Sequence, residues 1–447
     1  MKPSAIYSCQ SCGAQTPKWS GRCVECGRWG TVSEEEPPKS NISNSQRPAS
    51  APAKTISLND LTKTKSPPRT PTGNIELDRL LGGGLVRGEV ILLSGEPGIG
   101  KSTLLLQIAK SLTQPVLYLA GEESPEQIAV RAERLGLQNA NIEFLSETDA
   151  GTVAATITAR SPALTIIDSI QSLRCAEVGS EAGGPWQVRA SGAIITETAK
   201  RIGAPIIIVG QITKDGSIAG PKTLEHLVDA VLTFEGDRES GLRFLRVEKN
   251  RFGSNEEIAI FRMTERGLEP EINPSKFLLA DRATGVSGNA IACLLEGSRP
   301  LLAEIQALVS KSAYQTPIRR STGFDTNRLQ MILAVLEKRA GLNLSTLDVY
   351  LNVIGGITIR DQAADLAVAL AIASAAKDIA LPAGLVSAGE LGLGGEIRSV
   401  GRIEKRIAES EALGFDTLLF AGSRDQKTSN RIKAIKTLRE ALQIVGV

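Results

Sequence analysis

Gly95-Glu96-Pro97-Gly98-Ile99-Gly100-Lys101-Ser102 matches the pattern G-x-x-x-x-G-K-S/T at every fixed position. The apolar run 89–94 before it predicts a buried strand, and 103–112 after it predicts a helix. In this context the glycines let backbone N–H groups turn toward phosphate oxygens at a helix start. The stretch therefore predicts binding of a nucleoside triphosphate, and a chance glycine-rich turn is the less favoured alternative.

The individual roles follow from the same pattern. Lys101 is expected to reach the β- and γ-phosphates, and the Ser102 hydroxyl is expected to bind Mg²⁺. The nucleotide contacts should extend over residues 95–102 and to Thr103.

Length and composition bound the class of protein. A chain of 447 residues suggests two or three domains, and 42% hydrophobic with 22% charged residues is ordinary for globular proteins. A net charge of +2 is too small to indicate nucleic acid by itself. Because residues 1–10 lack an apolar signal-like segment and no apolar run is long enough to span a membrane, we expect a cytoplasmic protein without membrane contact.

Four of the six cysteines form two C-x-x-C knuckles, each followed by glycine: Cys9, Cys12, Cys23 and Cys26. This spacing predicts a tetrahedral, structural Zn²⁺ site in a module at 1–32, with a redox dithiol as the weaker alternative. A surface made of Lys18, Trp19, Arg22, Arg28 and Trp29 could contact nucleic acid or protein.

Residues 33–68 are rich in Ser, Pro, Lys, Asn and Glu, and their composition predicts a flexible linker. Ordered structure should resume near residue 69. A short helix capped near Thr72 and closed by the glycines at 82–84 then precedes the first core strand, as in RecA-like ATPases.

Polar residues follow three further apolar runs. Val116 to Ala120 leads to Glu122 and Glu123, either of which could activate water for attack on the γ-phosphate. We favour Glu122, and the alternative is that both residues cap the helix opened by Ser124.

The run 164–167 ends in Asp168, a candidate for holding Mg²⁺ through water, and 204–210 ends in Gln211, a candidate γ-phosphate sensor. Strands that alternate with helices predict a parallel, doubly wound α/β sheet. All these side chains should then share its carboxyl edge.

Three further segments, 211–216, 220–229 and the pentapeptide Lys249-Asn250-Arg251-Phe252-Gly253, make a family resemblance specific. With the zinc module, the chain resembles the RadA (Sms) family of bacterial recombination and repair ATPases over nearly its whole length. One departure is Gln211, where family members commonly have His. The resemblance implies ATP as the nucleotide, a RecA-like core at 69–272, a hexameric ring, and DNA contacts at Lys249, Asn250 and Arg251.

The pentapeptide lies some eighty residues beyond Asp168, so Lys249 and Arg251 should not reach the phosphate site of their own chain. We expect them to stabilise charge at a neighbouring subunit's site, as an arginine finger does. The alternative is a basic hairpin turn paired with Glu248 and Glu256.

From residue 273 to 447 the sequence resembles the α+β proteolytic domain of Lon. The nucleophile position is Ala363 and the lysine position is Arg406, with Lys405 one residue away. Alanine has no nucleophile and arginine stays protonated, so peptidase activity is not expected. Six cations cluster around the first helix of this domain and predict a basic surface: Lys311, Arg319, Arg320, Arg328, Lys338 and Arg339. The alternative is that they are scattered solvated charges.

The sequence thus indicates a DNA-dependent ATPase of recombinational repair that drives branch migration and strand extension. The expected partners are single-stranded DNA, branched recombination intermediates and a RecA-type recombinase, and the expected assembly is a homohexamer. Two alternatives are a Lon-type ATP-dependent protease and a RecA-like scaffold that binds ATP without moving on DNA.

Overall fold

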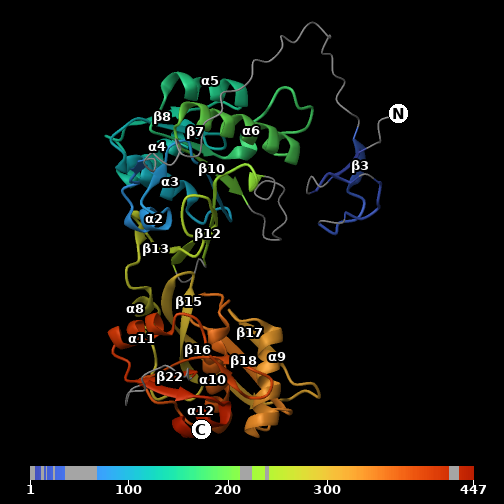
Figure 1. Cartoon of the computed structure of the whole chain (residues 1–447), viewed down its shortest axis with the longest axis vertical. Helices are drawn as coiled ribbons and strands as arrows, with labels where there is room; N and C mark the ends of the chain where they lie inside the picture. The colour runs from blue at the N-terminus through green and yellow to red at the C-terminus, as the bar shows by residue number, and fades with distance from the viewer. Residues whose placement is uncertain are drawn as a thin grey trace, which may run out of the picture. The chain divides into compact units, whose positions relative to one another are not determined.

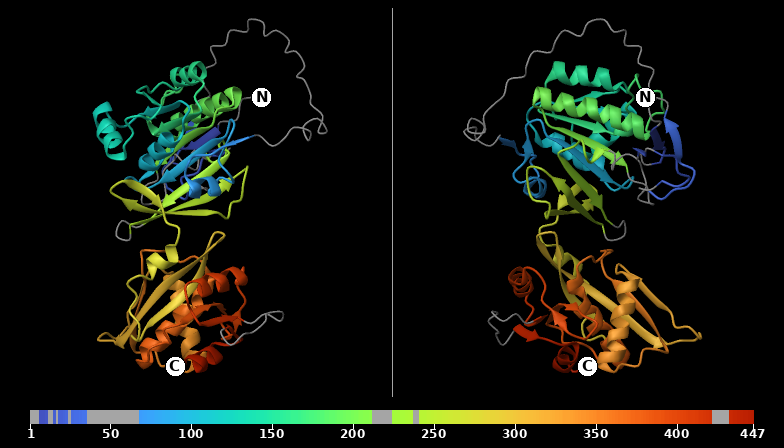
Figure 2. Two further views of the ribbon diagram at one scale, coloured as in Figure 1. Left: turned by 90° about the vertical axis from the view of Figure 1, so that its left-hand side faces the viewer. Right: turned by 45° about the vertical axis from the view of Figure 1, so that its right-hand side comes forward.

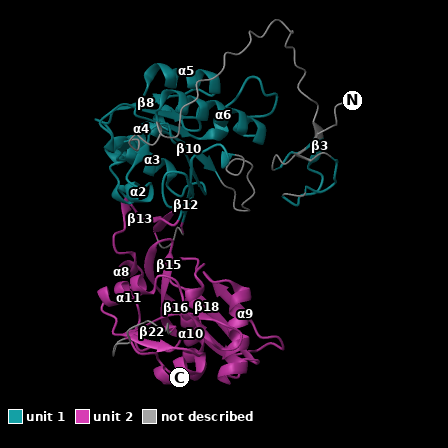
Figure 3. Ribbon diagram, viewed as in Figure 1, with its two compact units in different colours: residues 1–235, 247–255, 265–268 teal, residues 236–246, 256–264, 269–447 magenta. Residues whose placement is uncertain are grey.

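A computed structural model describes residues 6–11, 15–16, 18–23, 26–35, 68–211, 224–236, 241–421 and 432–447. The chain divides into two compact units, drawn in different colours in Figure 3. The first contains residues 1–235, 247–255 and 265–268, and the second contains 236–246, 256–264 and 269–447. The second unit thus begins before the predicted boundary at 272/273, because it takes in residues of three strands that precede it. None of the described helices has both the length and the apolar character needed to cross a membrane.

The amino-terminal cysteine module is a small antiparallel sheet. Its strands are β1 (Ile6–Cys9), β2 (Gln15–Thr16) and β3 (Val32–Glu35), in the order β2-β1-β3. The strand β3 extends three residues into the predicted linker, of which 36–67 lie outside the described residues.

The helix expected after the linker is α2 (Ile75–Leu80), which lies between β4 (Arg69–Thr70) and β5 (Leu85–Val86). Its N-cap is Asn74, two residues after Thr72, because the Asn74 side chain accepts from the Leu77 N–H. The Thr72 hydroxyl instead donates to Asp78 at 2.8 Å.

The core of the first unit is a parallel sheet with helices between its strands, which confirms the predicted doubly wound α/β fold (Figure 1). Six parallel strands lie in the order β11-β6-β10-β9-β7-β8. They are β6 (Val90–Gly95), β7 (Val116–Ala120), β8 (Ile142–Leu145), β9 (Leu164–Asp168), β10 (Ile206–Gln211) and β11 (Ala230–Glu235). The helices are α3 (Lys101–Ser111), α4 (Pro125–Leu135), α5 (Ala150–Arg160) and α6 (Pro185–Ile202).

Alternate side chains of each central strand point to opposite faces of this sheet. Val90 and Leu92 of β6 pack with Val153 of α5 and Val188 of α6 in one buried cluster. The helices α5 and α6 therefore cover the same face, as the two views in Figure 2 also show. Beyond β11 the sheet continues through β12 (Leu242–Asn250), β13 (Ile258–Thr264) and β14 (Gly267–Pro270).

The second unit contains a seven-stranded sheet in the order β17-β18-β16-β15-β19-β22-β23. Its strands are β15 (Asn289–Glu296), β16 (Arg299–Lys311), β17 (Arg319–Thr322), β18 (Leu347–Val353), β19 (Leu385–Ala388), β22 (Thr417–Ala421) and β23 (Ile432–Ile435). Between β19 and β22 in the sequence, β20 (Glu390–Leu391) and β21 (Ile397–Arg398) form a separate antiparallel pair. The helices are α8 (Pro274–Leu278), α9 (Thr326–Val335), α10 (Asp365–Lys377), α11 (Ile403–Ala412) and α12 (Leu438–Val445), with short turns η2 (Leu336–Ala340) and η3 (Gln362–Ala364).

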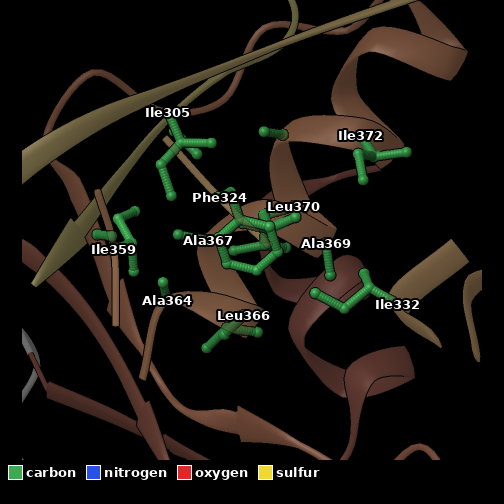
Figure 4. Close-up of a cluster of buried hydrophobic side chains, with 14 of the residues drawn as sticks. Ile305, Phe324, Ile332, Ile359, Ala364, Leu366, Ala367, Ala369, Leu370 and Ile372 are labelled. Carbon is green, nitrogen blue, oxygen red and sulfur yellow. The ribbon is translucent and has the colours of Figure 1, made fainter. Parts of the chain in front are cut away.

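The helix α10 is buried from Asp365 to Ser374, which explains why its sequence is apolar on every side. Figure 4 shows Ala367 and Leu370 of α10 among three other buried side chains, namely Ile305 of β16, Ile332 of α9, and Phe324, which lies just before α9. The two helices expected at 329–340 and 363–376 are thus confirmed as α9 with η2, and as η3 with α10.

Candidate nucleotide-binding site

The sequence predicts a phosphate cradle in the loop between β6 and α3. Gly95, Gly98 and Gly100 have φ angles of 153°, 77° and 117°, which residues with a Cβ rarely adopt. A methyl group at Gly95 would also stand 2.6 Å from the Phe234 carbonyl oxygen. The loop therefore needs glycine at these positions to bring its N–H groups to the start of α3.

Lys101 is buried at the first position of α3. Its Nζ donates to the carbonyl oxygens of Gly95 and Glu96, each at 2.8 Å. Burial lowers the pKa of Lys101, while the nearby carboxylates of Asp168 and Glu122 act in the opposite direction. The ammonium group thus lies between the cradle and the acidic residues at the ends of neighbouring strands.

Asp168 ends β9, and its Oδ2 accepts a hydrogen bond from the Tyr118 hydroxyl at 2.6 Å. Tyr118 is almost fully buried in β7, and burial raises its pKa well above the ordinary value, with Asp168 adding to the shift. The phenol therefore stays protonated and fixes the carboxylate. Ser102 and Asp168 offer a hydroxyl and a carboxylate oxygen, the kind of hard ligands that Mg²⁺ takes, so this pair fits the ion.

The two adjacent glutamates after β7 have different surroundings. The Glu122 carboxylate accepts from Nε2 of Gln211 at 2.8 and 3.0 Å, and it also accepts from the Ser169 hydroxyl. The Glu123 carboxylate forms a two-point ion pair with Arg131 of α4 at 2.6 and 2.7 Å. Glu122 thus faces the ends of β9 and β10, whereas Glu123 is engaged by the following helix.

The candidate groups from four neighbouring strands meet at one edge of the sheet. In the strand register Gly95 lies opposite Gln211, and Ala120, two residues before Glu122, lies opposite Asp168. Parallel strands are about 4.8 Å apart, so one phosphate group can reach several of these ends.

The pentapeptide 249–253 lies at the opposite edge. The Arg251 guanidinium contacts Asp229 Oδ1 at 3.3 Å, and Asp229 Oδ2 accepts from the Val90 N–H at the start of β6. Gly95 is five residues further along that strand, or about 17 Å away. Lys249 and Arg251 are therefore not brought together with the cradle of their own chain.

Within the pentapeptide the three polar side chains differ. Lys249 Nζ donates to the carbonyl oxygens of Glu225 and Val228 at 2.5 and 2.8 Å, and burial lowers its pKa. Asn250 is buried, and its Oδ1 accepts from the Phe252 N–H at 2.8 Å. Arg251 has a half-exposed side chain.

These contacts give each position of the pentapeptide a structural role. A methyl group at Gly253 would stand 2.8 Å from the Asn250 amide nitrogen, so glycine leaves room for that amide. Arg69 Nη2 donates to the Phe252 carbonyl oxygen at 2.5 Å and fastens the turn to β4. The Asn250 side chain therefore shapes the turn instead of facing solvent, and Arg251 pairs with Asp229 rather than with Glu248 or Glu256.

Sequence reasoning missed the buried acidic residues beside this turn. Asp229 is 4% exposed, and Lys200 Nζ lies 3.8 Å from its Oδ1. Glu89 is buried nearby, accepts from the Val86 N–H at 2.9 Å, and has its pKa raised to about 7 by burial. An acid directly before a buried strand, as at both positions, is the only sequence signal that could have indicated them.

The cysteine module brings three of its predicted ligands together, while Cys12 lies outside the described residues. The Sγ atoms of Cys9, Cys23 and Cys26 all lie within 4.8 Å of one another. Those of Cys9 and Cys26 are 3.7 Å apart. The edge of a tetrahedron with metal–sulfur bonds of 2.3 Å is about 3.8 Å, so these thiolates fit a tetrahedral Zn²⁺ site.

In the second unit one of the two peptidase-like positions, Arg406, forms a structural ion pair with Asp361. Ala363 is fully buried, and Arg406, 2% exposed, donates to Asp361 Oδ2 at 2.8 Å and to the carbonyl oxygens of Cys293 and Gly401. Asp361 also accepts from the Leu295 and Ala363 N–H groups. These contacts tie η3, β15 and α11 together.

Arg328, one member of the predicted basic surface, forms an ion pair with a buried residue instead. Arg328 forms an ion pair with Asp365, which is buried at the start of α10. Lys311, Arg320, Lys338 and Arg339 are exposed, and Arg319 is half-buried. Arg328 therefore stabilises the interior and is removed from the surface we expected.

Comparisons with known proteins show what this chain is similar to. The AAA domain family matches residues 70–217, and a rubredoxin metal binding domain matches residues 7–34. The DNA repair protein RadA of Bacillus subtilis is 44% identical over 427 residues, covering 94% of this chain and 92% of that protein. The DNA repair proteins RadA of Aquifex aeolicus and Pseudomonas aeruginosa are 44% and 43% identical, covering 99% and 93% of this chain and 99% and 92% of their own length. Among solved structures, that of the RadB recombinase is 25% identical, covers 44% of this chain and 97% of its own, and has a TM-score of 0.36.

Proposed function

Because this chain belongs to the RadA family of DNA repair proteins, we propose that it is a DNA-dependent ATP hydrolase that moves on DNA. Its RecA-like ATPase domain and zinc ribbon are the parts that this membership establishes. We propose further that it works in the cytoplasm on single-stranded DNA and branched recombination intermediates. There it would promote branch migration and strand extension together with a RecA-type recombinase.

Hydrolysis is assigned to the groups at the carboxyl edge. Lys101 would leave its two loop carbonyls to contact the β- and γ-phosphates, and Ser102 and Asp168 would hold Mg²⁺, which neutralises phosphate charge. Glu122 would accept the proton of the attacking water. Its contact with Gln211, and the engagement of Glu123 by Arg131, support Glu122 as the base.

The proposal of an assembly is supported by one observation. The pentapeptide is separated from the cradle of its own chain by the length of β6. A cation about 17 Å from the phosphates cannot stabilise their charge, whereas the same cation can do so across an interface. We propose that Lys249 and Arg251 complete the neighbouring subunit's site in a homohexamer and contact DNA with the same surface. Arg251 would exchange Asp229 for the phosphate.

The domain assignment follows the same reasoning. We propose a zinc module at 1–32, a linker at 33–68, an ATPase domain at 69–272 and a Lon-like domain at 273–447 without peptidase activity. Ala363 and the Arg406–Asp361 ion pair support the last point, because neither supplies a nucleophile or a base. The exposed cations of that domain would bind the DNA backbone.

The test combines ATPase and branch-migration assays on the wild type, Lys101→Ala and Lys249→Ala. We expect Lys101→Ala to lose hydrolysis, and Lys249→Ala to keep ATP binding but lose DNA-stimulated turnover and movement. An unaltered Lys249→Ala would remove the pentapeptide from the mechanism. A wild-type rate that single-stranded DNA does not change would favour the scaffold alternative, and casein cleavage would favour the protease.

A further inference from the structure

The second cysteine knuckle carries an unusual pair of aromatic side chains. Residues 21–23 and 28–30 pair like the two legs of a hairpin: Arg22 bridges to Trp29, and the Gly30 N–H donates to the Gly21 carbonyl oxygen at 2.8 Å. Cys23 and Cys26 lie at one end of these legs. The metal-binding turn therefore sets the position of Trp29.

Trp19 and Trp29 are 64% and 76% exposed, although indoles gain much from burial. A methyl group at Gly21 would stand 3.8 Å from Cζ3 of Trp29 and 3.9 Å from Cη2 of Trp19. Both rings thus lie next to the same glycine. We call Trp19, Gly21 and Trp29 the indole platform.

A hydrogen bond inside the module fixes the Trp19 ring of the platform. Trp19 Nε1 donates to the Val32 carbonyl oxygen of β3 at 3.1 Å. The polar edge of that indole is satisfied inside the module, so what remains exposed is its apolar face. A fixed, exposed ring face binds a flat partner with little loss of conformational entropy.

Charge around the platform favours an anionic partner. Between Lys18 and Trp29 the sequence has three cations and one carboxylate, Glu25. Arg22 Nε donates to the Gly27 carbonyl oxygen at 2.8 Å, which places this guanidinium across the hairpin that carries Trp29. Cations therefore lie in the same short segment as both rings.

The residues around the two rings favour a nucleic-acid partner over a protein partner. A protein interface normally surrounds its aromatic anchors with further apolar area. Among the described residues of the module, Trp19 and Trp29 are the only large apolar side chains that are exposed. Isolated rings with cations nearby are typical of surfaces that stack unpaired bases and neutralise their phosphates.

We propose that the indole platform binds single-stranded DNA by stacking bases on Trp19 and Trp29, while Lys18, Arg22 and Arg28 contact the phosphates. This inference rests on the proposed function and gives the zinc module its ligand.

Fluorescence tests the proposal in the full-length, zinc-loaded protein. The chain has three tryptophans, so Trp186→Phe leaves the platform as its only indole emitter. Oligothymidylate should quench this emission to saturation. An abasic strand of the same length and charge should not, since it lacks the rings that stack.

Matched variants in the same background separate the ring from its N–H group. Trp19→Ala and Trp29→Ala should each weaken oligothymidylate binding about tenfold. Trp19→Phe and Trp29→Phe should retain most of the affinity, measured by anisotropy of labelled DNA. Equal zinc content in all four variants, from a thiol-release assay, establishes that the module is folded.

Equal quenching by both strands, or no quenching by either, would overturn the proposal. The same holds if the alanine variants keep their DNA affinity and instead lose binding to a recombinase, which would make the platform a protein-docking surface. ATPase stimulation by oligothymidylate is measured in parallel. If oligothymidylate stimulates the ATPase but does not quench the platform, the platform proposal is wrong and the proposed function is unaffected. If it does neither, both the platform proposal and the proposed function are wrong.

Discussion

At the scale of single residues, the two neighbouring glutamates illustrate how position decides chemistry. Glu122 and Glu123 have the same side chain and adjacent places after β7, yet one meets Gln211 and the other Arg131. The two-point ion pair with Arg131 holds the Glu123 carboxylate against α4, whereas Glu122 faces the ends of β9 and β10. The account therefore rests on Glu122.

Exchanging each glutamate for glutamine tests this assignment. Glu122→Gln should lower kcat by about a hundredfold or more while ATP still binds, since glutamine cannot take the proton of water. Glu123→Gln is the matched control and should keep kcat within a few fold. Steady-state ATPase and fluorescent-nucleotide binding measure both, and the reverse order of effects would assign the base to Glu123.

A buried acid at the opposite edge makes a prediction about pH. The pKa of Glu89 is raised to about 7 by burial, so the folded state keeps its proton while the unfolded chain, with a pKa near 4.5, loses it. The carboxyl therefore disfavours folding increasingly as pH rises from about 4.5 to 7, by up to roughly 3 kcal/mol. Its effect is absent below pH 4.5 and complete above pH 7.

Glu89→Gln removes this titration and retains an acceptor for the Val86 N–H. The free energy of unfolding of the variant should fall less than that of the wild type between pH 5 and pH 8, by denaturant titration. Parallel pH profiles for the two proteins would show that Glu89 ionises normally.

At the scale of elements, the sequence predicted most of the fold that positions the site. Short apolar runs bounded by glycine and acidic residues mark β6, β7, β9 and β10, and the capping sequence at Ser124 marks α4. The N-cap of α2 could be placed only to within about two residues, because Thr72 and Asn74 are both good capping residues and the backbone decides between them. Asp229 could not be foreseen, since its partner Val90 is 139 residues away and meets it only through the order of the strands.

The Arg406–Asp361 ion pair makes an element-scale prediction about stability. Arg406→Ala should lower the free energy of unfolding of the carboxyl-terminal unit by about 3–5 kcal/mol, because it removes a buried guanidinium and leaves the partly buried Asp361 without its cation. Arg406→Lys should rescue only part of this loss, since an ammonium group cannot replace the planar fork.

The exposed pair between Arg398 and Glu396 in the same unit supplies the control, and Arg398→Ala should change stability little. Thermal unfolding followed by circular dichroism compares the three variants. If Arg406→Ala unfolds like the wild type, the ion pair does not hold η3 and α11 together.

At the scale of the whole molecule, the proposed intersubunit site draws its groups from the opposite edges of one sheet. The cradle and Glu122 lie at the carboxyl edge, and Arg251 lies beside Asp229 at the other. One subunit can then supply phosphate-binding groups and its neighbour the charge-stabilising cation, so that hydrolysis depends on assembly. Lys101 should accordingly matter for turnover only within a ring on DNA.

Mixing two inactive variants tests this claim most directly. Lys101→Ala lacks a working cradle but keeps its cations, whereas Arg251→Ala keeps its cradle, so each alone should have almost no DNA-stimulated ATPase activity. In rings reassembled from equal amounts, about a quarter of the interfaces join an intact cradle to an intact Arg251. We predict recovery of ATPase activity toward that fraction of the wild-type rate; a mixture as inactive as its two components would contradict a site shared between subunits.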